Sequence, residues 1–69
     1  MEKLKSFVMS CLHDCANYTE RKEIWLYQAF GVVQFYVLEH PEQYKEVDNM
    51  WSELKPRFER EIWGTNFEL

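Results

Sequence analysis

The sequence predicts an all-α protein, a single small three-helix bundle that covers residues 1–69. Two observations predict it. Apolar residues recur at steps of three and four along much of the chain, which is the spacing of one face of an α-helix. Glycine and proline number only two each, so the chain is neither disordered nor rich in loops. We expect helices at about 2–17, 20–39 and 42–63.

The first helix, about residues 2–17, is predicted by one continuous apolar stripe. Polar side chains fall on the opposite side of the same helix, so this helix is expected to lie on the surface and bury one face. The stripe consists of Leu4, Phe7, Val8, Cys11, Leu12, Cys15 and Ala16.

The junction near residue 18 allows two interpretations. Asn17 can cap the second helix while Glu20, three residues later, reaches back as in a capping box. Thr19 is an alternative cap. Because neither glycine nor proline marks this junction, one continuous helix over 2–39 is the competing interpretation, and such a long helix would need a partner chain.

The second helix, about residues 20–39, contains a stretch without any charge from 24 to 38. Residues 32–38 are also compatible with a β-strand, but no other segment offers a convincing strand to pair with it. Gly31 lies in the middle of the helix and costs about 1 kcal/mol relative to alanine. We expect that it lets another helix or a bulky ring approach closely.

The third helix, about residues 42–63, has the clearest amphipathic pattern. Pro41 suits its first position, and Pro56 is expected to kink or split it. Gly64 is expected to cap its C-terminus, and the tail 65–69 is expected either to fold back on the core or to fray. Its stripe consists of Tyr44, Val47, Trp51, Leu54, Phe58 and Ile62.

A helix that is apolar on all sides must be covered on all sides. Two short partner helices cover two sides of the second helix, so we predict a homodimer with this helix at its interface. The alternative is that aromatic side chains of the other helices and the tail suffice. The candidate interface residues are Trp25, Phe30, Val33, Val37, Trp51 and Trp63.

Charge and length exclude several classes of partner. The net charge of −4 opposes binding to the phosphate backbone, so no nucleic-acid role is expected. The uncharged stretch is shorter than the roughly 17–25 residues of a membrane span. The first residues lack the sustained apolar run of a signal peptide, so we expect a cytoplasmic protein with reduced cysteines.

The residues that could carry chemistry are few. Cys11 and Cys15 share one helix face, but His13 points away from both, and a zinc site needs about four convergent ligands. We expect both cysteines to be small buried hydrophobes. A thiol or metal-binding role for them is the alternative. His13 and Asp14 are neighbours about 100° apart on a helix, so they form no catalytic dyad.

No catalytic, cofactor or metal site is therefore predicted. The sequence favours a small non-catalytic interaction or structural module that associates with itself through its aromatic-rich helix. The alternative is an acidic inhibitor that binds a partner protein with a basic groove; salt-sensitive binding would favour it.

Overall fold

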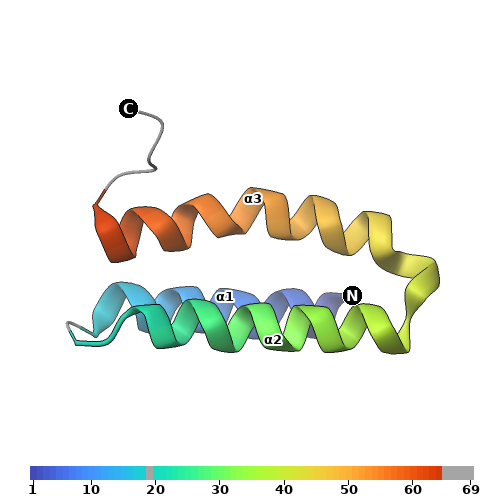
Figure 1. Ribbon diagram of the computed structural model, residues 1–69, viewed down its shortest axis with the longest axis horizontal. Helices are drawn as coiled ribbons and strands as arrows, with labels where there is room; N and C mark the ends of the chain where they lie inside the picture. Colours follow the sequence, from blue (N-terminus) through green and yellow to red (C-terminus); the bar gives the residue numbers. More distant parts are fainter. Residues whose placement is uncertain (19, 65–69) are drawn as a thin grey trace.

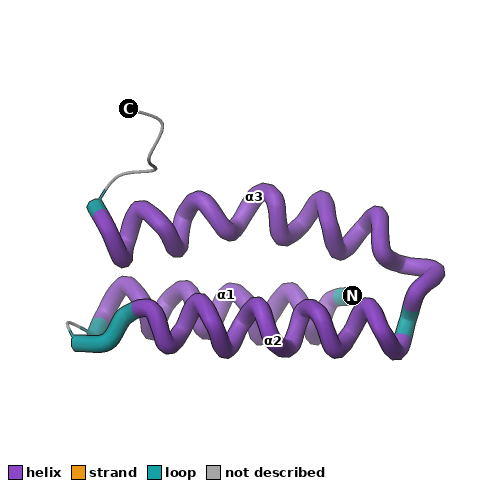
Figure 2. The backbone as a smooth tube through the Cα atoms, viewed as in Figure 1, coloured by secondary structure: helices purple, strands orange, loops and turns teal. Residues whose placement is uncertain are grey.

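The computed structural model describes residues 1–18 and 20–64. Three α-helices lie side by side, the second antiparallel to the first and the third, and a short 3-10 helix precedes the third α-helix (Figure 1). Every regular element in the described residues is helical (Figure 2), which confirms the predicted all-α three-helix fold. The elements are α1 (Glu2–Asn17), α2 (Glu23–Glu39), η1 (Pro41–Gln43) and α3 (Tyr44–Trp63).

The break between α1 and α2 excludes one continuous helix over 2–39. Tyr18 leaves helical geometry with φ −97° and ψ 142°. Arg21 has a φ of +54°, in the left-handed region that ends helical propagation. As a result α2 begins at Glu23, three residues later than the sequence predicted.

The predicted capping box at this junction is wrong. Asn17 is the last residue of α1, and its side-chain Nδ2 donates to the His13 carbonyl at 2.7 Å. This bond turns the Asn17 amide back onto the preceding turn of α1, so it does not cap α2. The N-cap of α2 is Lys22, with no side-chain capping bond. The other predicted cap, Thr19, lies outside the described residues.

The third helix largely follows its prediction. Pro41 opens η1, and α3 then continues through Pro56 without being split. Gly64 has a φ of +80°, and its N–H donates to the Arg60 carbonyl at 2.8 Å, so the predicted C-cap is confirmed. The prediction for the tail falls on residues 65–69, which lie outside the described residues.

The core is a single cluster to which all three helices contribute. The two cysteines belong to it, as predicted: Cys11 and Cys15 are buried among aliphatic side chains and carry free thiols. The buried residues are Leu4, Val8, Cys11, Leu12, Cys15, Leu26, Ala29, Val33, Val47, Met50, Leu54 and Phe58.

Polar contacts link the bundle at both ends of α2. At one end, the Lys22 ammonium donates to the Glu61 carbonyl at 3.3 Å and lies 3.8 Å from its carboxylate. At the other end, the amino group of Met1 donates to the Tyr36 hydroxyl at 3.1 Å, and that hydroxyl donates to Gln43 Oε1 at 2.7 Å. These contacts join the two ends of α2 to the rest of the bundle, while its buried residues Leu26, Ala29 and Val33 determine which side faces outward.

In the described part of the chain, no helix combines the length and the hydropathy needed to cross a bilayer.

Candidate protein interface

The outward side of α2 is apolar. Leu26, Ala29 and Val33 point into the core and set the inward direction of this helix. On a helix with 100° per residue, Ile24 and Phe35 lie nearly opposite that direction. Their side chains, with those of Tyr27 and Leu38, face solvent, and the exposed fraction reaches 64% for Tyr27 and Phe35 and 77% for Leu38. We call the surface formed by Ile24, Tyr27, Gly31, Phe35 and Leu38 the outer face of α2.

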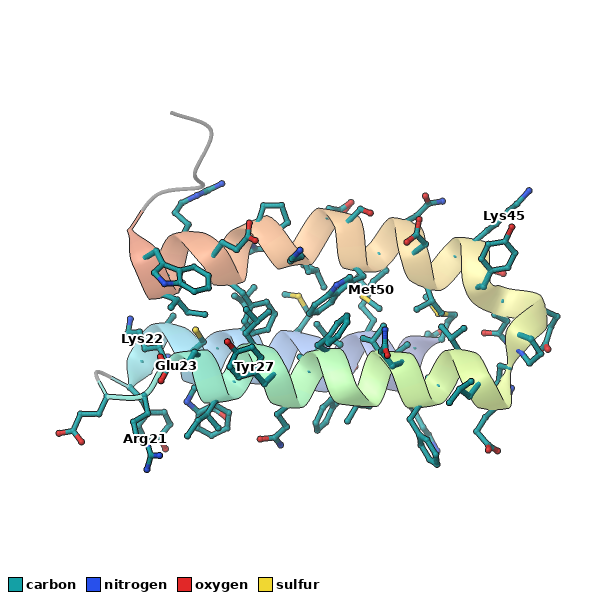
Figure 3. The ribbon with its side chains drawn as sticks, viewed as in Figure 1. Arg21, Lys22, Glu23, Tyr27, Lys45 and Met50 are labelled. Carbon is teal, nitrogen blue, oxygen red and sulfur yellow. The ribbon has the colours of Figure 1, made fainter. Side chains whose placement is uncertain are left out.

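Exposed large apolar side chains gather on α2 rather than spreading over the molecule. Of the ten such side chains in the described residues, six belong to this helix. In Figure 3 Tyr27 projects from α2, whereas Met50 of α3 lies between the helices. A concentrated exposed apolar surface is typical of a site of interaction. The six are Ile24, Tyr27, Phe30, Val32, Phe35 and Leu38.

Gly31 lies on this outer face. A Cβ placed on it would meet no atom within 4 Å, so no helix or ring of the described chain uses the close approach that the sequence led us to expect. Inside the bundle the glycine only weakens the helix, by about 1 kcal/mol relative to alanine.

The six interface residues predicted from the sequence do not form one exposed surface. Val33 is buried in the core, and Trp25, Val37 and Trp51 are half-buried against it. Phe30 and Trp63 are exposed, but they lie on different helices. The structure does bring Phe30 and Trp51 together, with ring centroids 5.8 Å apart.

The interface residues predicted from the sequence do not include four exposed residues of the outer face: Ile24, Tyr27, Phe35 and Leu38. The signal that finds them is the direction opposite Leu26, Ala29 and Val33, and that direction is known only once α1 and α3 are in place. A helix that is apolar all round does not reveal by its pattern which side is the inner one.

A shallow groove between α2 and α3 extends the apolar surface sideways. Phe30, Val37 and Leu38 form its α2 wall, and Tyr44 and Trp51 form its α3 wall. The outer face and this groove are contiguous through Leu38, so a partner seated on α2 would also contact aromatic rings of α3.

Charges border the outer face of α2, and Asp48 of α3 lines the adjoining groove. Glu23 and Glu39 bound the uncharged stretch of α2, and Arg21 is exposed just before it. On α3 acids and bases alternate, and the Lys55 ammonium lies 3.9 Å from the Glu59 carboxylate. Because the acids are interleaved with cations, the acidic-inhibitor hypothesis gains no support here and stays a prediction.

The two thiols are poorly suited to chemistry. Burial raises the pKa of Cys11, and Asp14 raises it further. Burial also raises the pKa of Cys15, although Lys22 partly opposes the shift. A buried thiol with a raised pKa is a weak nucleophile and a poor metal ligand. Among the described residues, no three His, Cys, Asp or Glu side chains converge as a metal site requires.

Comparison of this chain with protein-family models, with curated proteins and with solved structures finds no match.

Proposed function

We propose that this protein is a small non-catalytic cytoplasmic interaction module that associates with itself through the outer face of α2. The observation that carries the proposal is the gathering of six exposed large apolar side chains on one helix of the described bundle. The buried thiols with raised pKa support a role without catalysis.

The magnitudes are compatible with a stable pair. A dimer that covers Tyr27, Phe35 and Leu38 removes two copies of each from water. Full burial of such a side chain contributes about 1.5–3 kcal/mol, so six partly exposed ones give on the order of 10 kcal/mol. Association costs about 4–15 kcal/mol in lost freedom of motion. The gain lies within the range of this cost, so the proposed dimer is expected to be reversible.

The area required is also available. An interface of standard size takes about 800 Å² from each partner, which is about a sixth of the 5081 Å² that this chain exposes. One side of one helix, together with the adjoining groove, is a surface of that order.

Solution mass tests the proposal. Light scattering on a sizing column should give twice the mass of one chain at high concentration and a falling mass on dilution. Leu38→Glu places a charge in the outer face and should give a single-chain mass throughout, with unchanged helical circular dichroism.

Asn49→Glu is the matched control, because it adds the same charge to the exposed side of α3. It should dimerise like the unaltered chain. A single-chain mass for the unaltered protein at every concentration would contradict self-association, and a dimer that survives Leu38→Glu would place the interface elsewhere.

A further inference from the structure

The sequence of α2 carries matching residue classes at four of the eight positions on either side of Gly31. Gly31 is the central residue of the 17-residue helix. EIWLYQAF precedes it, and VVQFYVLE follows it. Counted outward from the glycine, both sides carry glutamine at the third position, an aromatic ring at the fourth, a branched aliphatic side chain at the seventh and glutamate at the eighth.

The bundle leaves this symmetric pattern facing outward. Viewed down the helix, Gly31 lies within about 20° of the direction opposite Leu26, Ala29 and Val33, so it is the centre of the exposed side as well as of the length. The fold, which depends on α1 and α3, thus exposes the symmetric side of α2. This agreement is independent of the sequence pattern itself.

We infer that two copies of the chain pack α2 against α2 in antiparallel orientation, with a twofold axis passing beside Gly31. The inference rests on the proposed self-association and specifies its geometry. In a twofold interface both chains use the same surface. If residue i of one chain contacts residue j of the partner, residue j also contacts the partner's residue i. An antiparallel helix pair centred on residue 31 brings residue n opposite the partner's residue 62 − n.

This arrangement matches like with like across the interface. Tyr27 faces the partner's Phe35, and aromatic pairs of this kind contribute about 0.5–1.5 kcal/mol beyond the area that they bury. Ile24 faces the partner's Leu38, which packs aliphatic against aliphatic side chains. Gln28 faces the partner's Gln34, and two amides can hydrogen-bond to each other.

The same arrangement accounts for Gly31. Helix axes pack 8–10 Å apart, and the side chains at the crossing point set that distance. A glycine at the crossing of both helices permits the shortest distance, so the outer rings can reach the other chain. Within its own bundle Gly31 permits no close packing contact, because a Cβ at this position would meet no atom within 4 Å.

Charge favours the antiparallel orientation over the parallel one. It brings Arg21 of one chain toward the partner's Glu39 and Glu42, whereas a parallel pair would bring each of these residues beside its own copy. The helix dipoles are also opposed in the antiparallel pair, which is the favourable orientation. The same register brings Glu23 toward the partner's Glu39 and Glu20 toward the partner's Glu42. Arg21 lies between these two acids in the chain, whereas Lys22 is engaged by Glu61 of its own chain.

Mixed disulfide formation tests the orientation. Ile24→Cys and Leu38→Cys change exposed positions, so both variants should fold. In the antiparallel pair the two different thiols meet. Two copies of Cys at position 38 are separated by 14 residues along the axis, about 21 Å, far beyond the 7 Å limit between Cα atoms of a disulfide.

An equal mixture of the two variants, oxidised mildly, should therefore give the mixed disulfide at least tenfold faster than either variant alone gives its own. The native thiols are buried and should not compete. Rapid cross-linking by Leu38→Cys alone would show a parallel pair and overturn the inference. Equal rates for all combinations, or no disulfide in a sample of dimeric mass, would also overturn it.

A second pair of variants tests the crossing point. Gly31→Leu should raise the thermal midpoint of the single chain, because it removes a helix glycine and clashes with nothing. It should also weaken dimerisation at least tenfold by holding the two helices apart. Asn49→Leu is the matched control: it adds the same side chain to the exposed side of α3 and should leave the dimer intact.

The outcomes separate this inference from the proposed function. Dimerisation unchanged or strengthened by Gly31→Leu would overturn the crossing at residue 31 and leave self-association standing. A single-chain mass for the unaltered protein would overturn both. Binding of that single chain to vesicles of neutral phosphatidylcholine, abolished by Leu38→Glu, would make the outer face a lipid-binding surface instead.

Discussion

The outward sides of α2 and α3 differ in kind, although both helices bury a comparable inner face. On α3 the outward positions carry Lys45, Asn49 and Ser52, which water solvates well. On α2 the corresponding positions carry Tyr27 and Phe35. Packing against the core and solvation by water therefore account for both sides of α3. The outward side of α2 is apolar, and the described chain leaves it uncovered.

The sharpest way to break this comparison is to remove one phenylalanine from each side. Phe58 of α3 is fully buried, so Phe58→Ala should cost about 3–5 kcal/mol of unfolding free energy, most of what so small a domain has. Phe35→Ala should stay within about 0.5 kcal/mol in a dilute sample of single chains. Urea denaturation followed by circular dichroism measures both.

The comparison would be wrong if Phe35→Ala destabilised the dilute chain as strongly as Phe58→Ala. At high concentration, in contrast, Phe35→Ala should lower the unfolding midpoint, because the proposed dimer would contribute to apparent stability there.

Trp25 lies between the two extremes and should give an intermediate effect. Its ring is half-buried and stacks on Tyr18, with centroids 5.5 Å apart. We expect Trp25→Ala to cost about 2 kcal/mol, below the value for a fully buried ring. Trp25→Phe is the matched control and should recover most of the loss by keeping the stack. If Trp25→Ala left the thermal midpoint unchanged, this ring would contribute as little to the stability of the single chain as the exposed residues of the outer face.

The helices were predictable because their patterns are local. The stripe of α1 predicts a helix over about 2–17, which agrees with the observed Glu2–Asn17, and Pro41 and Gly64 mark where the third helical segment begins and ends. The turn before α2 was not predictable in this way. Asn17 has equal short-range reasons to cap the helix behind it or the one ahead, and the left-handed backbone of Arg21 has no signature in the side chains.

The exposed site was predictable only in outline. The absence of charge from residue 24 to residue 38 indicated that α2 needs more cover than two helices give. It does not indicate which side lacks cover, so the predicted interface includes half-buried Trp25 and buried Val33 and omits the exposed Phe35 and Leu38. Ring size draws attention to tryptophan, but helical phase relative to the neighbouring helices decides exposure.

The inner side of the bundle should respond to alkaline pH. The folded pKa of Cys11 and of Cys15 lies above the ordinary value of 9.0, so the folded state holds its thiol protons more tightly than the unfolded state. Stability from this source is complete below about pH 9 and falls as pH rises above it, by at most about 1.4 kcal/mol per pH unit for each thiol.

Urea midpoints between pH 8 and pH 10.5 measure this slope. The double variant Cys11→Ala and Cys15→Ala should be less stable at pH 8, because it leaves small cavities. Its stability should fall less steeply with pH than that of the unaltered chain. Equal slopes would mean that other groups, such as lysines and tyrosines, govern the alkaline loss.

A modest effect is expected at Pro56, which can be compared with Gly31 because both residues weaken a helix. Proline at position 56 denies the Ser52 carbonyl its intrahelical partner, yet α3 continues through it. Pro56→Ala restores that bond, but it also frees the unfolded chain, which offsets about 0.4–1 kcal/mol of the gain. We expect a net stabilisation of about 1 kcal/mol, seen as a higher thermal midpoint, with the solution mass unchanged.

Gly31→Leu should raise the same midpoint in the dilute chain while separating the proposed dimer into single chains. If Pro56→Ala also separated the dimer, α3 would belong to the interface, and the contrast between its outward side and that of α2 would fail.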